Sequence, residues 1–260
     1  MNRMDFDCFV GGWPFHKVRR PGFDDLRALH AANGIGGGFV SSTDAIFWND
    51  PYEADRALSR TLAGQEEYRH VMTVNPTLPG VWDDLKRARR EFRLAGVRIM
   101  PGFHGYSLAD PVCRPLWDFL RENGLPLFLT LRMEDERVTY LFHPVTVGLA
   151  EIRSFLETEK GFPVLLCNIR DAELPALTDT LLSRQDVFAD ACGFKGGLFP
   201  LDTLYQNGLT GRIVYGSLSP IFCLRSTLLA FETAQIPAEE IDRMLSGRDF
   251  LAAIRAAAAD

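Results

Sequence analysis

The sequence lacks several features that would place it in a special class of protein. No apolar run reaches the roughly 20 residues that cross a bilayer, and no signal-peptide pattern is seen near residue 1. No C-x-x-C pair occurs, which argues against a zinc ribbon or a disulfide framework. The five scattered cysteines are Cys8, Cys113, Cys167, Cys192 and Cys223. We therefore expect a cytoplasmic protein with reduced thiols and no membrane partner.

An excess of positive charge is also missing. The 28 Lys and Arg residues are outnumbered by 34 Asp and Glu residues, giving a net charge of -6. General affinity for nucleic acid depends on a basic surface that displaces phosphate counterions. The one dense basic run, residues 86–93, lies in a helical pattern and is interpreted as a solvated helix face. Nucleic acid is therefore not expected as a partner.

Short apolar runs alternate with amphipathic segments along the whole chain. This alternation is typical of βα units around a parallel sheet. The predicted strands are residues 4–10, 37–41, 69–74, 96–100, 127–131, 164–168, 187–191 and 213–215. The predicted helices between them are residues 23–33, 53–63, 81–95, 111–123, 147–160, 172–183, 198–208 and 224–235. Eight such units in 260 residues predict an α/β fold, a single (β/α)8 TIM barrel spanning residues 1–260, since such barrels average about 250 residues.

Local signals support this assignment. Asp110 and Pro111 form a helix start, and Asn123 with Gly124 forms a helix stop. A last helix at residues 238–245 and the Ala-rich end are expected to pack across the outside of the barrel. A Rossmann-like sheet is the structural rival, but no G-x-G-x-x-G follows a strand and opens a helix.

Three parts of the sequence carry motifs in a fixed order. The first is Gly-Val-Arg-Ile-Met-Pro-Gly-Phe-His-Gly-Tyr at residues 96–106, followed by residues 116–120 and 124–127. The second is Arg-Met-Glu-Asp-Glu-Arg at residues 132–137, and the third is Arg-Ile-Val-Tyr-Gly-Ser-Leu-Ser-Pro at residues 212–220. Together they resemble strands four, five and eight of the amidohydrolase-related family. This group of metal-dependent-hydrolase-like barrels includes decarboxylases of the aminocarboxymuconate type and metal-free pyrone dicarboxylate lactonases.

The resemblance also shows which metal ligands are replaced. The His-x-His of the family's first strand matches Asp7 and Phe9, and the strand-five histidine matches Thr130. The strand-six histidine matches Cys167, and the strand-eight aspartate matches Leu218. A zinc or manganese site needs three or more converging donors, and only Asp7 and Cys167 remain. We therefore expect neither metal nor another cofactor.

Polar residues nevertheless end most of the predicted strands. They are Asp7, Arg98, Thr130, Arg132, Asn168, Arg170, Asp190, Ser217 and Ser219. An arginine can bind a carboxylate through two parallel hydrogen bonds, so Arg132 and Arg170 suit a small acidic ligand. Alternatively, Arg98 and Arg132 form internal ion pairs. The partners considered for them are Asp7, Asp135 and Asp190.

The candidate catalytic residues are Asp7 or Asp190 as base and His104 as acid or base. The glycines flanking the His104 loop would expose its imidazole, although packing against backbone is an alternative. Cys167 is expected to be a buried, inert thiol. These residues predict a metal-independent hydrolase or lyase for a small carboxylated substrate. The residues expected to bind that substrate are Arg98, Thr130, Arg132, Asn168, Arg170 and Ser217.

A catalytically inactive pseudoenzyme that serves as partner or scaffold for an active homologue is the alternative function. Two predicted loops after strands one and two are unusually apolar, which favours either a lid or a contact patch for another chain. Their apolar residues are Trp13, Phe15, Ile46, Phe47 and Trp48. The contact-patch interpretation predicts a homodimer or a hetero-oligomer with a homologous barrel.

Overall fold

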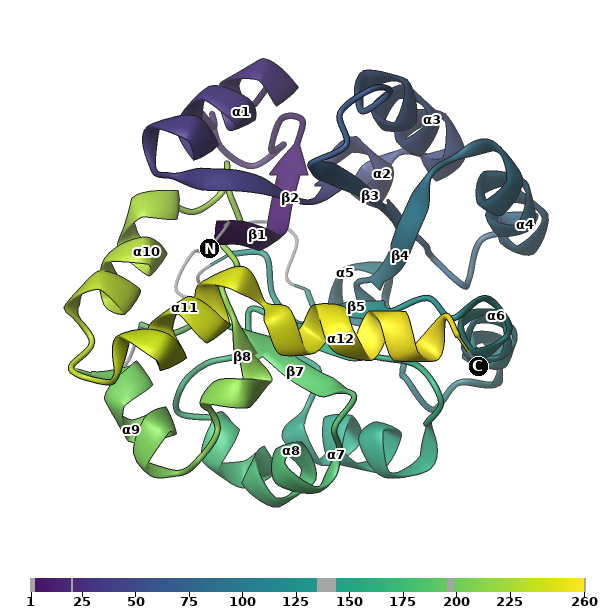
Figure 1. Ribbon diagram of the computed structural model, residues 1–260. Helices are drawn as coiled ribbons and strands as arrows, with labels where there is room; N and C mark the ends of the chain where they lie inside the picture. Colours follow the sequence, from purple (N-terminus) through teal and green to yellow (C-terminus); the bar gives the residue numbers. More distant parts are fainter. Residues whose placement is uncertain (1–2, 20, 135–143, 196–198, 260) are drawn as a thin grey trace.

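A computed structural model describes residues 3–19, 21–134, 144–195 and 199–259 of the chain (Figure 1). Its sheet has eight strands in the order β1 to β8, and every neighbouring pair is parallel. The strands are β1 Arg3–Val10, β2 Ile35–Ser42, β3 Tyr68–Thr73, β4 Leu94–Ile99, β5 Leu127–Thr130, β6 Val164–Cys167, β7 Val187–Asp190 and β8 Ile213–Val214. All eight predicted strands are confirmed. Sequential strand order excludes the Rossmann-like alternative, whose strand order reverses at a switch point.

The chain beyond β8 closes the sheet onto β1. The amide of Phe6 donates a hydrogen bond to the Tyr215 carbonyl at 2.9 Å, and the amide of Phe9 donates to the Ser219 carbonyl at 2.7 Å. A parallel bridge joins Cys8 to Ser219. These contacts make the sheet a barrel, in which the carboxyl ends of all strands meet at one opening, the mouth.

Helices surround this barrel, and the last of them lies across its end. They are α1 Phe23–Ala32, α2 Asp44–Phe47, α3 Pro51–Thr61, α4 Val81–Glu91, α5 Pro101–His104, η1 Pro111–Cys113, α6 Arg114–Asn123, α7 Leu149–Thr158, η2 Leu174–Leu177, α8 Thr178–Ser183, α9 Pro200–Gln206, η3 Thr210–Arg212, α10 Leu224–Thr233, α11 Ala238–Ser246 and α12 Arg248–Ala257. The predicted stop at Gly124 is confirmed, since this residue ends α6 in the left-handed conformation with φ 58°. No helix in the described ranges has the length and apolar character of a membrane span.

The last helix closes the end of the barrel opposite the mouth. Figure 1 shows α12 lying across that opening. Phe250 of α12 is fully buried and meets the rings of Phe6, Phe39, Phe128 and Phe188 at centroid distances of 5.2 to 6.3 Å. This aromatic layer fills the lower interior. The sequence had indicated only that the C-terminal residues pack across the outside, and Phe250 explains their position by inserting its ring into the barrel.

A bulge in β1 determines which residues face the interior. Between Asp5 and Cys8 the strand advances three residues while β2 advances two. Because of the extra residue, the consecutive side chains of Phe6 and Asp7 both turn inward. Phe6 enters the aromatic layer, and Asp7 lies above it beside Arg98. Strand alternation alone would have placed them on opposite faces.

Candidate active site at the barrel mouth

A fully buried arginine lies at the centre of the mouth. The Nη1 atom of Arg98, on β4, is 2.7 Å from Asp7 Oδ1 and 2.7 Å from Thr130 Oγ1. Its Nε atom donates to Ser41 Oγ at 2.8 Å, and its guanidinium lies 4.5 Å from the centre of the Phe9 ring. Side chains from β1, β2 and β5 therefore hold a permanent cation inside the barrel. Of the two roles considered for Arg98, an internal ion pair and substrate binding, the structure shows the ion pair with Asp7.

A second carboxyl group lies next to this ion pair. Asp190, at the end of β7, is fully buried, and its Oδ1 accepts the amide of Asn168 at 2.9 Å and the amide of Cys192 at 3.3 Å. Burial and the charge of Asp7 raise the pKa of Asp190 well above its usual range. Burial also raises the pKa of Asp7, but there the Arg98 charge opposes the rise. Adjacent buried carboxyls of this kind retain a shared proton, so we assign it to Asp190 and the negative charge to Asp7.

The residues at the five matched metal-ligand positions face the same end of the barrel. Asp7 and Thr130 contact Arg98 directly, and the charge of Arg98 also acts on Cys167. Burial, with the nearby charge of Asp7, raises the pKa of Cys167 well above its usual value, as expected for an inert thiol. Leu218 packs in the apolar layer above, together with Phe9.

The residues at this centre do not fit a divalent metal ion. Donor atoms of Asp7, Asp190 and Cys192 lie within 4.8 Å of one another. However, the set contains no imidazole, and the negative charge of one of its donors, Asp7, is already opposed by a guanidinium. Arg98 already neutralises that charge at 2.7 Å and would repel an added cation. Arg98 thus places a fixed positive charge beside Asp7.

The backbone beside the acid pair is strained. Asn168 has φ 56° and Leu218 has φ 52°, and these are the two non-glycine residues with positive φ in the described part of the chain. Each such conformation costs roughly 1–2 kcal/mol. The Asn168 amide donates to Asp190 at 2.9 Å, and the Leu218 amide donates to the Asp7 carbonyl at 2.7 Å. The strain is therefore concentrated where the two carboxyl groups are positioned.

An aromatic cluster covers the mouth. The Trp13 ring meets Phe15, Phe47 and Phe103 edge-on at centroid distances of 5.3 to 5.9 Å. Trp13 is 5% exposed, and it packs in one apolar layer with Phe9. These contacts support the lid interpretation of the apolar loops, whereas the homodimer or hetero-oligomer stays a prediction.

His104 helps to fasten this lid. Its Nε2 donates to the Ile46 carbonyl at 3.1 Å, linking α5 to α2. Burial lowers the pKa of His104, so the imidazole is neutral at neutral pH. The structure thus shows the packing arrangement rather than an exposed imidazole, because the flanking glycines fold the loop back onto α2. A catalytic role for His104 would require the lid to open.

The two arginines expected to accept a carboxylate lie at the rim. Arg132 binds Glu173 through two hydrogen bonds of 2.9 and 2.5 Å. Glu173 also accepts the backbone amide of Arg170 at 3.0 Å, and the Arg170 side chain is exposed. The internal pairing considered for Arg132 is therefore present, but with a partner that the sequence analysis did not name. Asp135 lies outside the described residues.

The Ser217 hydroxyl does not turn toward Arg98. It donates to Asp5 Oδ2 at 2.5 Å, and the Ser217 amide donates to Asp5 Oδ1 at 3.0 Å. Asn168, in contrast, is at the mouth, and its Nδ2 donates to the Arg132 carbonyl at 2.9 Å. The bulge in β1 places Asp5 within reach of the Ser217 hydroxyl, and contact of Ser217 with a substrate stays a prediction.

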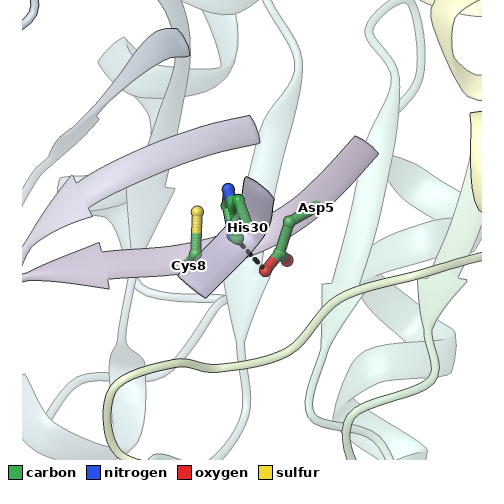
Figure 2. Close-up of side chains that lie close together, drawn as sticks. All are labelled: Asp5, Cys8 and His30. Carbon is green, nitrogen blue, oxygen red and sulfur yellow. Dashed lines mark hydrogen bonds and ion pairs between the residues drawn. The ribbon is translucent and has the colours of Figure 1, made fainter. Parts of the chain in front are cut away.

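Asp5 is the hub of a second buried network, of which Figure 2 shows Asp5, Cys8 and His30. His30 Nε2 lies 3.2 Å from Asp5 Oδ2, and its Nδ1 lies 3.2 Å from the Tyr68 hydroxyl. The thiol of Cys8 donates to the Phe39 carbonyl at 3.3 Å. Asp5, Cys8 and His30 form a potential ligand set, but protein partners already satisfy their polar atoms. We interpret the network as structural. It fixes the backbone next to the site, since Asp5 also accepts the Asp7 amide at 3.1 Å.

Sequence reasoning missed three polar residues at this end of the barrel. Ser41 holds Arg98, Glu173 holds Arg132, and Thr73 is buried at the end of β3. Ser41 and Thr73 stand in predicted strands, so period-two alternation would have indicated their inward orientation. Glu173 had no such signal, because it precedes a short helix rather than ending a strand.

Comparison with known proteins gives the fold. The sequence matches no family model and no curated protein. A solved, uncharacterized TIM-barrel protein from Bordetella bronchiseptica has TM-score 0.72 at 14% identity, with 100% of both chains covered. The 5-carboxyvanillate decarboxylase of Sphingomonas paucimobilis has TM-score 0.71 at 13% identity, covering 98% of this chain and 99% of that one. A dihydroxybenzoic acid decarboxylase from a Polaromonas species, solved with manganese and the inhibitor 2-nitroresorcinol, has TM-score 0.71 at 13% identity, covering 98% and 97%.

The similar structures include one named as a TIM-barrel protein and two decarboxylases. The fold expected from the sequence motifs is therefore confirmed. At these identities the likeness extends to the fold and carries no chemistry of its own.

Proposed function

We propose that the chain is a metal-independent hydrolase or lyase that acts on a small carboxylated substrate. The observation that carries this proposal is the buried group of Arg98, Asp7 and Asp190. A fixed cation stabilises negative charge that develops on a substrate, and inside a dry barrel this effect is stronger than in water. A neutral carboxylic acid next to a carboxylate provides both a proton donor and a proton acceptor.

Asp190 and Asp7 together can carry out both proton transfers of a hydrolysis. In a hydrolysis, the proton of Asp190 passes to the leaving oxygen and a proton of the attacking water passes to Asp7. The pair ends with the single proton with which it began, now on the other carboxyl group. In a lyase reaction, the bond between the substrate carbon and its carboxylate breaks, its electron pair stays on that carbon, and Asp190 protonates the carbon as carbon dioxide leaves. Asp190 then regains a proton from water before the next turnover.

Two further observations support an active site over a purely structural core. Most buried polar atoms in protein cores have hydrogen-bond partners, yet Arg98 Nη2 and Asp190 Oδ2 in this centre lack one. Strained backbone at Asn168 and Leu218 lies at the same place, as it often does at functional sites. The substrates named for two barrels of this fold, 5-carboxyvanillate and dihydroxybenzoic acid, both carry a carboxylate.

The pseudoenzyme remains the second candidate, and one observation favours it. Arg98 is fully buried, and two of its three nitrogens are held by Asp7, Ser41 and Thr130. Such a core could act purely as structure. In that case the exposed rings of Phe47 and Trp48, 38% and 49% accessible, would be available to a homologous partner chain.

The test is turnover by chelator-treated protein. The substrates are 5-carboxyvanillate, 2,6-dihydroxybenzoate and 2-pyrone-4,6-dicarboxylate. We expect the wild type to consume at least one, and Asp190→Asn to lose about 100-fold or more in rate, the usual effect of removing an acid. Asp179→Asn, an exposed aspartate on α8, is the matched control and should keep full rate. Turnover that needs added metal, or survives in Asp190→Asn, would refute the mechanism. No turnover, with a homologous barrel co-purifying, would favour the pseudoenzyme.

A further inference from the structure

A buried histidine on an outer helix contacts the barrel wall beside the mouth. His30 lies in the last turn of α1, and neither its side chain nor that of Asp5 on β1 is exposed. Its Nε2 lies 3.2 Å from Asp5 Oδ2, the contact drawn in Figure 2. A carboxylate oxygen accepts hydrogen bonds, so we assign the hydrogen of this contact to Nε2. In the neutral ring, Nδ1 then accepts the Tyr68 hydroxyl, 3.2 Å away.

Tyr68 fixes the orientation of the His30 ring. The two rings stack with their centroids 5.7 Å apart and their planes at 8°. Burial raises the pKa of Tyr68 to about 12, so its hydroxyl keeps its hydrogen at neutral pH and can donate it to Nδ1. A histidine held at Nδ1 in this way presents Nε2 to Asp5 in one direction. The imidazole is therefore a fixed donor to Asp5.

Asp5 in turn holds Asp7 from two sides. Its Oδ1 accepts the Asp7 amide at 3.1 Å, across the bulge in β1. Oδ1 also accepts the Ser217 amide at 3.0 Å, and Oδ2 accepts the Ser217 hydroxyl at 2.5 Å. The turn at Ser217 contacts Asp7 as well, since the Leu218 amide donates to the Asp7 carbonyl at 2.7 Å. The amide of Asp7 is thus held by Asp5, and its carbonyl by the turn that Asp5 holds.

This arrangement depends on the bond from His30. Leu218 has a left-handed φ of 52°, which a non-glycine residue keeps only when its surroundings enforce it. The other three hydrogen bonds to Asp5 come from the bulge and the turn themselves, so His30 is the donor that anchors Asp5 to a separate element. Without this anchor the Asp5 carboxyl group can rotate, and Asp7 loses the position that places its Oδ1 2.7 Å from Arg98 Nη1.

We propose that His30 is a positioning residue for the pair of Asp7 and Arg98, and that it acts through Asp5. The inference rests on the proposed function, because the position of the pair affects turnover only if the mouth is an active site. The geometry of the pair can nevertheless be measured without turnover. Helix α1 then takes part in the site although it lies outside the barrel wall (Figure 1).

The experiment compares the NMR signals of the Arg98 guanidinium in the wild type and in variants of the network. His30→Ala removes the donor to Asp5, so the Arg98 signals should shift. His30→Gln offers an amide hydrogen near the position of Nε2 and should restore the signals of the wild type. Tyr68→Phe keeps the stacked ring but loses the hydroxyl, and should shift the signals less than His30→Ala does.

A second measurement applies if a test substrate is consumed. His30→Ala should then lower kcat about 10- to 100-fold with little change in KM, because a small displacement of the reacting groups acts on the chemical step. His30→Gln should recover most of kcat. Leu181→Ala is the control for lost stability alone, since Leu181 is fully buried on α8 in the outer core. It should lower the melting temperature but leave the Arg98 signals in place.

Several results would overturn the inference. Unchanged Arg98 signals in His30→Ala, with a lower melting temperature, would show that His30 serves stability alone. Equal shifts in Leu181→Ala, or no restoration in His30→Gln, would exclude the bond to Asp5 as the cause. If His30→Ala does not fold, Tyr68→Phe decides instead, and unchanged signals there count against the inference. Shifted signals without turnover of any test substrate would uphold the positioning role and defeat the proposed function, whereas turnover that His30→Ala retains in full would do the reverse.

Discussion

Nη1 of Arg98 lies 2.7 Å from Oδ1 of Asp7, and both side chains are completely buried. By the sequence resemblance, Asp7 stands where related barrels have a metal-binding histidine. In the mechanism proposed above, Arg98 supplies the positive charge that a metal supplies in a metal-dependent barrel. The chemistry proposed for the mouth depends on this pair and on the proton that Asp190 holds beside it.

The first prediction concerns metal content. Purified protein should carry less than about one tenth of an equivalent of zinc, manganese or iron, because fewer than three anionic or imidazole donors converge near Asp7. Elemental analysis measures this directly, and a chelator should leave the melting temperature unchanged. About one metal ion per chain would contradict the prediction.

Breaking the central ion pair should be costly. Asp7→Asn leaves Arg98 charged and buried without its ion-pair partner, so the free energy of unfolding should fall by about 3–5 kcal/mol. Urea denaturation measures the loss. The double variant with Arg98→Met should lose less than Asp7→Asn alone, because it removes the unpaired charge. A loss below about 1 kcal/mol for Asp7→Asn, as is usual for surface pairs, would show that the pair is accessible to water.

The rim pair should behave differently from the central pair. Arg132 and Glu173 have side chains that are 10% and 18% exposed, so water screens them in part. Arg132→Met keeps most of the aliphatic stem but removes the guanidinium that binds Glu173. The free energy of unfolding should therefore fall by about 1–3 kcal/mol, between the values for surface and buried ion pairs. In chemical denaturation, Glu173→Gln and the double variant should show strong non-additivity. Simple addition of the two losses would mean that the pair does not form in solution.

The acid pair should make stability depend on pH. Burial and the Asp7 charge raise the pKa of Asp190 well above its usual 3.8, so the folded state holds a proton that the unfolded state releases. The free energy of unfolding should therefore fall as the pH rises from about 4 toward the folded-state pKa. Asp190→Asn cannot ionise, so the stability of the wild type relative to this variant should decline over the same interval. Equal slopes for both proteins in denaturation across this pH range would count against a protonated Asp190.

Periodicity and turn signals predicted the fold well because each βα unit leaves a local signature. The apolar run at residues 127–131 and the Asn123–Gly124 stop both depend on neighbours in sequence. The position of α12 was less predictable, because the insertion of Phe250 among rings from four strands is a long-range contact.

The site could be predicted only in part for the same reason. Inward-facing polar residues at strand ends identified Asp7, Arg98 and Thr130, which the structure brings together. The bulge in β1 shifts side-chain directions by one residue, and it lets Asp5 capture the hydroxyl of Ser217. The local sequence contains no pattern that predicts such a bulge.

Carboxyl carbon NMR of protein labelled at aspartate is the most direct test of the shared proton beside Arg98. The chemical shift of a carboxyl carbon reports its protonation, and Asp7→Asn and Asp190→Asn assign the two signals. We predict that at neutral pH the Asp190 signal has the shift of a carboxylic acid while the Asp7 signal has that of a carboxylate. If both signals show ionised carboxylates at neutral pH, the site holds no acid, and the mechanism proposed for it is contradicted.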